Sequence, residues 1–191
     1  MIKAIIIDFY GVIWSDPYTS WIRNHQGFDR NTEFIDASAK FDKGQISVAQ
    51  FHELLSKISG RDIGSITEDY SSGSTIDRGV IELIAKLHTS YRVALLSNAP
   101  SDVIRGILKG NDLEKYFDQL IISSEVGLAK PAKAIFELTL EKLNIEASQA
   151  LFIDDSQYYI EGAEKVGIKC IQFISTTQLT NDLKDLNIIQ N

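Results

Sequence analysis

The stretch that decides the fold is AIIIDFYGV, at residues 4–12. Four apolar residues that end at a polar one are typical of a short strand buried on both faces, as in a parallel sheet. Four later apolar runs have the same character, and they lie at residues 93–96, 120–122, 151–153 and 170–174. The sequence therefore predicts five buried strands.

Apolar residues recur at helical spacing between these runs, in segments that begin at Val80, Val103, Ile135 and Ile160. Strands that alternate with helices of this length predict an α/β fold: a three-layer, Rossmann-like parallel sheet with helices on both faces. Residues 14–76 interrupt this order, because their apolar spacing is helical and their aromatic residues are numerous. We expect a helical cap at 14–76, inserted into an α/β core formed by residues 1–13 and 77–191.

Composition narrows the possible partners. The chain has 191 residues and a formal net charge of -7, so it offers no broad basic surface for nucleic acid. The single cysteine, Cys170, excludes an internal disulfide and a thiolate zinc cage. No apolar stretch approaches the roughly 20 residues of a membrane span. We expect a cytoplasmic protein with neither a nucleic-acid nor a membrane partner, and the oligomeric state stays open.

Polar side chains follow three of the predicted strands. Asp8 follows the first, Ser97 and Asn98 follow the second, and Asp154 and Asp155 follow the fourth. Because the carboxyl ends of parallel strands form one ligand crevice, we expect these side chains to converge. A group of carboxylates needs a compensating positive charge, and hard oxygen ligands without cysteine or clustered histidine favour Mg²⁺.

A lysine in a short loop is the second candidate for that charge. Lys130 lies in the sequence GLAKP, at residues 127–131, directly before a predicted helix. A cation at a helix start opposes the helix dipole, so a need for positive charge in the site explains its position better.

These segments together resemble the four ordered motifs of the haloacid dehalogenase superfamily of hydrolases. The motifs are DFYGV at 8–12, Ser97-Asn98, the Lys130-Pro131 loop, and FIDD at 152–155. The sequence FDKGQIS, at 41–47, is similar to the helical cap that one branch of the superfamily carries after its first motif. The resemblance spans residues 4–174 and implies a hydrolase, with a phosphoric monoester hydrolase as the leading interpretation.

The resemblance also implies roles in catalysis. Asp8 would be the nucleophile and would form an aspartyl phosphate. Ser97 and Asn98 would hold the transferring phosphoryl group through hydroxyl, amide or backbone N–H donors. Lys130 would neutralise both the nucleophile and the charge that develops in the transition state.

The implied metal site uses the remaining acidic residues. Asp154 and Asp155 would anchor Mg²⁺, which would also touch Asp8 and the backbone carbonyl of Tyr10. Tyr10 stands where phosphatases of the superfamily carry a second aspartate, the general acid and base. A phenol can donate a proton but is a poor base at neutral pH, so the candidate catalytic residues are Asp8, Lys130 and an atypical Tyr10.

Three functions fit this mixture of features. The first is a Mg²⁺-dependent phosphatase of a small phosphorylated metabolite. The second is a metal-independent 2-haloacid dehalogenase, since dehalogenases of the superfamily carry tyrosine at this position; it would need a cap arginine, for which Arg23 is the candidate. The third is a member that binds a phosphorylated ligand with little turnover.

Overall fold

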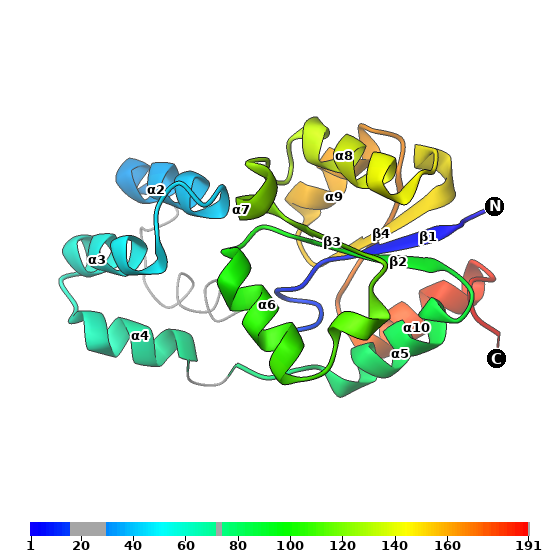
Figure 1. Ribbon diagram of the computed structural model, residues 1–191, viewed down its shortest axis with the longest axis horizontal. Coiled ribbons are helices and arrows are strands. Elements are labelled where there is room, and N and C mark those ends of the chain that lie inside the picture. Colours follow the sequence, from blue (N-terminus) through cyan, green and yellow to red (C-terminus); the bar gives the residue numbers. More distant parts are fainter. Residues whose placement is uncertain (16–29, 72–73, 191) are drawn as a thin grey trace.

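A parallel sheet forms the centre of the molecule. The computed structural model describes residues 1–15, 30–71 and 74–190. Five strands lie in the order β3-β2-β1-β4-β5, and each neighbouring pair is parallel (Figure 1). The strands are β1 (Ala4–Ile7), β2 (Arg92–Ser97), β3 (Gln119–Ile122), β4 (Ala150–Asp154) and β5 (Lys169–Gln172).

Helices cover both faces of this sheet. Alternate side chains of β1 point to opposite faces: Ile5 and Ile7 belong to one apolar cluster, and Ala4 and Ile6 belong to the other. The first cluster includes residues of α5 (Arg78–His88), α6 (Ser101–Gly110) and α10 (Thr176–Asp185). The second includes residues of α8 (Lys133–Leu143) and α9 (Gln157–Glu164). The predicted three-layer α/β fold is confirmed.

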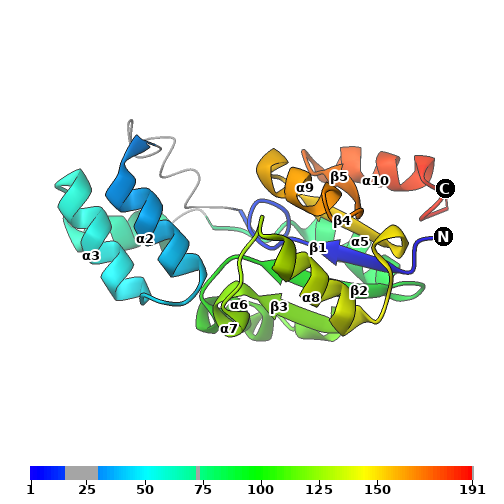
Figure 2. The same ribbon diagram turned by 90° about the horizontal axis from the view of Figure 1, so that it is seen from above.

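Three further helices form a separate group, which we call the helical unit (residues 32–71). It consists of α2 (Thr32–Asp42), α3 (Val48–Ser59) and α4 (Ile63–Ser71). Its buried apolar cluster contains Phe34, Ala37, Phe51, Leu55 and Ile66. The unit lies beyond the carboxyl ends of the strands, and both chain ends lie at the opposite end of the molecule (Figures 1 and 2).

Polar caps explain where two of these helices begin. The Asn31 side chain accepts a hydrogen bond from the Phe34 N–H at the start of α2. Ser47 and Gln50 form a capping box at the start of α3. Both helices therefore begin at signals that lie in the local sequence.

The remaining helices of the described residues are short. They are the 3₁₀ helices η2 (Glu114–Tyr116) and η3 (Ala147–Gln149), and the single-turn helix α7 (Ser123–Val126). The predicted fifth strand extended to residue 174, but β5 ends at Gln172, and Ser175 then caps α10. Within the described ranges, no helix combines the length and the apolar character that crossing a membrane requires.

Candidate active site

The ends of β1 and β4 bring three carboxylates together. Ile7 and Ile153 are partners in the β1–β4 ladder, so Asp8 and Asp154 follow at neighbouring positions. One carboxylate oxygen from each of Asp8, Asp154 and Asp155 lies within 4.8 Å of the others. Both Asp8 and Asp154 are buried. Three hard oxygen donors this close together could hold a divalent cation.

The turn after β1 makes room for the third carboxylate. Gly11 adopts a φ of 81°, in the left-handed region that favours glycine. A Cβ atom at this position would overlap the Asp155 carboxylate. The glycine therefore permits Asp155 to approach the backbone of the turn.

Lys130 lies between two of these carboxylates. Its Nζ is 2.8 Å from Asp8 Oδ1 and 2.6 Å from Asp154 Oδ2, and the side chain is 1% exposed. It also lies over the ring of Tyr159, with Nζ 4.6 Å from the ring centroid. Burial opposes protonation, but Asp154 and Asp8 outweigh it and raise the pKa of Lys130. The lysine is therefore a fixed positive charge in the site.

The positive charge of Lys130 does not fully offset the cost of ionising Asp8. Burial, followed by the neighbouring charge of Asp154, raises the pKa of Asp8 well above its ordinary value, although Lys130 acts in the opposite direction. Lys130 is shared between Asp8 and Asp154, so a further cation would stabilise the ionised form of Asp8. The donor set and its charge both fit a bound Mg²⁺.

The end of β2 adds a hydroxyl group. Ser97 is paired with Ile122 in the β2–β3 ladder, and β2 lies beside β1. The residue is 1% exposed, and its Oγ has no hydrogen-bond partner among the described residues. A buried hydroxyl without a partner is costly unless a ligand supplies the missing bond. Ser97 therefore has the properties of a ligand-binding group.

The side chain of Asn98 contacts the backbone of Lys130. Its Nδ2 donates to the Lys130 carbonyl at 3.0 Å, and its Oδ1 accepts from the Lys130 N–H at 2.8 Å. This paired contact fixes the loop that presents Lys130. The side-chain amide is thus engaged within the protein, and a phosphoryl contact by the Asn98 backbone stays a prediction.

Tyr10 lies in the turn between Asp8 and Gly11. The half-buried ring packs against the first apolar cluster and makes an edge contact with Phe9, with 5.1 Å between ring centroids. The position places a phenol close in sequence to Asp8. Metal binding by the Tyr10 carbonyl stays a prediction, and Arg23 lies outside the described residues.

Two further residues lie at the site although the sequence did not identify them. Asp42, the last residue of α2, accepts a hydrogen bond from Asn98 Nδ2 at 3.2 Å. Tyr159, on α9, lies under Lys130, and its hydroxyl is 3.5 Å from the same Asn98 atom. The only sequence signal for Asp42 was its place in the FDKGQIS segment.

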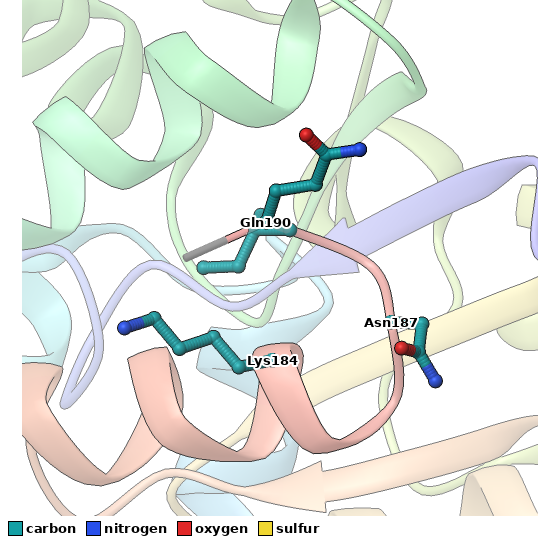
Figure 3. Close-up of a pocket in the computed structure, with 4 residues that line it drawn as sticks. Lys184, Asn187 and Gln190 are labelled. Atoms are coloured by element: carbon teal, nitrogen blue, oxygen red, sulfur yellow. The ribbon is translucent and has the colours of Figure 1, made fainter.

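A surface hollow near the C-terminus is unrelated to this site. It is lined by Lys184, Asn187, Ile189 and Gln190 (Figure 3). The C-terminal end of the chain lies at the opposite end of the molecule from the helical unit (Figure 1). The carboxylate cluster at the strand ends is therefore the candidate active site.

A family model matches most of the chain. The model for haloacid dehalogenase-like hydrolases matches residues 2–167. The chain belongs to this family. The match covers strands β1 to β4, the helical unit and all four motifs. The predicted membership among haloacid dehalogenase-like hydrolases is confirmed.

Relatives within the family carry phosphatase names. The chain is 28% identical over 193 residues to the D-ribitol-5-phosphate phosphatase of Bacteroides thetaiotaomicron, covering 90% of this chain and 92% of the relative. It is 33% identical over 101 residues to the phosphoglycolate phosphatase of Pectobacterium atrosepticum, covering 52% of this chain and 43% of the relative. The chain therefore spans less than half the length of the second relative.

A solved structure from the same family has a similar fold. A variant of a haloacid dehalogenase family enzyme from Bacteroides thetaiotaomicron, in complex with magnesium and inorganic phosphate, superposes with a TM-score of 0.70 at 25% identity. The match covers 90% of this chain and 94% of the other. In that enzyme the fold holds magnesium and inorganic phosphate.

Proposed function

We propose that this chain is a Mg²⁺-dependent phosphatase that hydrolyses a small phosphorylated metabolite through an aspartyl phosphate on Asp8. The observation that carries the proposal is the cluster of Asp8, Asp154 and Asp155, whose carboxylate oxygens lie within 4.8 Å of one another. A cation site that includes the nucleophile suits attack on an anionic phosphate ester. The named relatives support this substrate class.

The hydrogen bonds of Asp8 indicate which oxygen would attack. Oδ1 accepts from the Phe9 N–H at 2.7 Å and lies 2.8 Å from Lys130 Nζ. These contacts hold the carboxylate in place and leave Oδ2 to form the bond to phosphorus. The ester bond breaks, the alcohol leaves, and water then attacks phosphorus to release inorganic phosphate and restore Asp8.

Other residues would bind and orient the phosphoryl group. The Ser97 hydroxyl would donate to a phosphoryl oxygen, together with the Asn98 backbone. Lys130 would neutralise negative charge that develops during transfer. Asp8, Asp154, Asp155 and the Tyr10 carbonyl would hold Mg²⁺, which when bound supplies positive charge to the phosphoryl oxygens.

The helical unit would serve as the cap that selects the substrate. We assign residues 14–76 to this cap, and residues 1–13 and 77–191 to the core. The cap contributes Asp42, whose carboxylate oxygen lies 3.2 Å from Asn98 Nδ2. A sugar or polyol phosphate fits a polar cap residue at this position, and the ribitol-phosphate relative favours the same class.

A panel of phosphate esters tests the function. Purified protein should release inorganic phosphate from nitrophenyl phosphate and from at least one sugar or polyol phosphate in the presence of Mg²⁺. Chelation should remove this activity. The Asp102→Asn variant, which changes an exposed carboxylate on α6, should retain it and serves as the matched control.

Two further measurements on the purified protein separate the two alternative functions. Release of chloride from 2-chloropropionate without metal would favour the dehalogenase. Binding of inorganic phosphate without turnover of any ester would favour the phosphate-binding member. Either result would contradict the proposed phosphatase.

The metal site has its own test. Replacing Asp155 with alanine should weaken Mg²⁺ binding, because one of three carboxylate donors is lost. We expect Mg²⁺ to raise the melting temperature of the wild-type protein and to have a smaller effect on Asp155→Ala. Equal melting temperatures for the wild type with Mg²⁺ and with chelator would argue against a metal site.

A further inference from the structure

Three contacts attach the C-terminal end of α2, and the turn after it, to the sheet core. The Asp42 carboxylate accepts from Asn98 Nδ2, and the Asp42 carbonyl accepts from the Ser123 hydroxyl. Gly44, with a φ of 68°, lies against Ser124, where a Cβ atom would overlap the serine side chain. The position of Asp42 relative to the core is therefore fixed by its own backbone and by the turn after it.

Ser123 connects this attachment to the loop that follows β2. The same hydroxyl that donates to Asp42 accepts from the Ala99 N–H at 2.9 Å. Ser123 is fully buried. The end of α2 is thus joined to the segment that carries Ser97 and Asn98, which places Asp42 beside the proposed phosphoryl site.

The orientation of Asn98 determines how it meets Asp42. The Lys130 N–H donates to Asn98 Oδ1, which identifies the other amide atom as the nitrogen, and this nitrogen also donates to the Lys130 carbonyl. That nitrogen donates to Asp42 Oδ2. A proton on Asp42 would therefore reside on the other oxygen, Oδ1, which this contact leaves available.

The turn after β1 lacks the carboxylic acid that this chemistry needs. A phosphatase of a sugar or polyol ester must protonate an alkoxide as it leaves and then remove a proton from water. Position 10 holds tyrosine, which is a poor base at neutral pH. In an in-line displacement the leaving oxygen lies on the far side of phosphorus from Asp8, in the direction of the helical unit.

We propose that Asp42 is the general acid and base of the reaction, delivered from the helical unit in place of the acid that position 10 lacks. This inference rests on the proposed phosphatase function. In the first step Asp8 Oδ2 bonds to phosphorus, the bond from phosphorus to the ester oxygen breaks, and the Asp42 proton moves to that oxygen. In the second step Asp42 takes a proton from water, the water oxygen bonds to phosphorus, and the bond from phosphorus to Asp8 breaks.

The surroundings of Asp42 suit both steps. Burial raises its pKa to about 6, while the hydrogen bond from Asn98 and the charges of Lys130 and Lys43 act in the opposite direction. The phenol of Tyr159 also lies near Asp42, and burial keeps that phenol protonated by raising its pKa. A carboxyl group with a pKa close to the working pH can both give and accept a proton.

The test compares two leaving groups in Asp42→Asn. We expect kcat/KM for ribitol 5-phosphate to fall by about 100-fold or more, since general acid catalysis contributes about 10² to 10⁴. Nitrophenolate leaves without help, so kcat/KM for nitrophenyl phosphate should fall far less. The Asp36→Asn variant, which changes an exposed carboxylate on the same helix, is the control and should match the wild type on both esters.

The pH profile provides a readout that a structural role would not change. Ionisation of the phosphate ester near pH 6 affects both substrates alike. The wild type should lose additional activity on ribitol 5-phosphate as the pH rises past the pKa of Asp42. The pH profile of Asp42→Asn should lack this additional loss. Equal losses on both esters, or no loss on either, would overturn the proposal.

Two more variants keep the test decisive. Asp42→Glu retains a proton donor and should keep more activity on ribitol 5-phosphate than Asp42→Asn, even if docking of α2 is disturbed. Tyr10→Asp, which places an acid two residues after the nucleophile, should improve Asp42→Asn more than it improves the wild type. A benefit of Tyr10→Asp that is equal in both backgrounds would contradict a role for Asp42 as the acid.

Failure of the inference differs from failure of the proposed function. If the wild type hydrolyses esters and Asp42→Asn matches it, Asp42 is not the acid although the protein is a phosphatase. If the wild type hydrolyses no ester in the presence of Mg²⁺, the proposed function is wrong and the inference is wrong with it.

Discussion

The sheet core and the helical unit supply the active site in different ways. The core contributes side chains from the ends of three adjacent strands, and the ladder pairing of β1 with β2 and β4 sets their positions. The helical unit contributes Asp42 from the end of a single helix, attached through one turn. The residues proposed to bind phosphate thus lie at the ends of buried strands, whereas the position of the proposed acid depends on how α2 docks on the core.

The two regions also differ in how they are stabilised. Both faces of the sheet are covered, so every side chain of β1 is buried. The helical unit has its own apolar cluster, in which the rings of Phe41 and Phe51 stack with 4.3 Å between centroids. Separate cores allow one region to loosen while the other keeps its structure. This difference can be tested at four points.

The largest effect on turnover should come from a substitution in the sheet core. Asp8→Asn should lower turnover by at least about 10⁴-fold, or about 5 kcal/mol in the activation free energy, since an amide cannot form the covalent intermediate. The fold should be intact, because the amide fills the same volume and removes one charge from the cluster. Phosphate release and thermal melting measure the two properties, and activity that persists in a clean preparation would exclude Asp8 as the nucleophile.

Two phenylalanines test whether the regions unfold separately. Phe152→Ala in β4 and Phe51→Ala in α3 should each cost about 3 to 5 kcal/mol, because both rings are fully buried. We expect Phe152→Ala to speed hydrogen exchange throughout the chain. Phe51→Ala should speed exchange in α2 and α3 and leave β1 and β4 protected. Equal acceleration in both regions after Phe51→Ala would indicate a single cooperative unit.

The core was largely predictable from the sequence. Apolar runs such as residues 4–7 are typical of buried strands in a parallel sheet, and residues that follow such strands meet at one edge. The positions of Asp8 and Asp154 at the ends of two such runs are therefore enough to place them together. The sequence could not reveal that Asn98 binds the Lys130 backbone, because the contact depends on how two loops fold against each other.

The helical unit was predicted only in outline. Its helical spacing was visible in the sequence, but the bounds of α2, α3 and α4 were not. Asp42 lies between Phe41 and Lys43 at the end of a helix, where a charged residue is usually solvated. Nothing local indicates that this carboxylate faces the core, because its burial arises from docking between regions far apart in the chain.

A substitution in the attachment between the two regions should lower stability less than a substitution in either apolar core. Ser123→Ala removes the hydroxyl that bridges the Ala99 N–H and the Asp42 carbonyl, and leaves both buried groups without this partner. We expect a loss of about 1 to 3 kcal/mol. The loss of activity on ribitol 5-phosphate should exceed that on nitrophenyl phosphate, because Asp42 is displaced. Thermal melting and the two-substrate assay measure these effects, and unchanged stability would show that the bridge does not hold α2.

An effect no larger than that of Ser123→Ala concerns the charge of Asp42. Its pKa is raised from 3.8 in the unfolded chain to about 6 in the folded one, so the folded protein binds the proton more tightly. Folding stability therefore falls as the pH rises from about 4 to about 6. Asp42→Asn removes this penalty, and we expect it to be more stable than the wild type by about 1 to 3 kcal/mol at pH 8.

The pH dependence of that gain distinguishes a functional carboxylate from a structural one. Below about pH 4 the carboxyl is protonated in both states, so the advantage of Asp42→Asn should disappear there. Asp36→Asn serves as the control, because its carboxylate is exposed and pairs with Lys40 in a surface contact of small expected energy. Urea unfolding at pH 4 and pH 8 measures both variants. A variant at Asp42 that is less stable than the wild type at pH 8 would mean that the carboxylate serves docking. A more stable variant with lower activity on ribitol 5-phosphate would mean that the helical unit keeps this charge for catalysis, at the expense of its own attachment to the core.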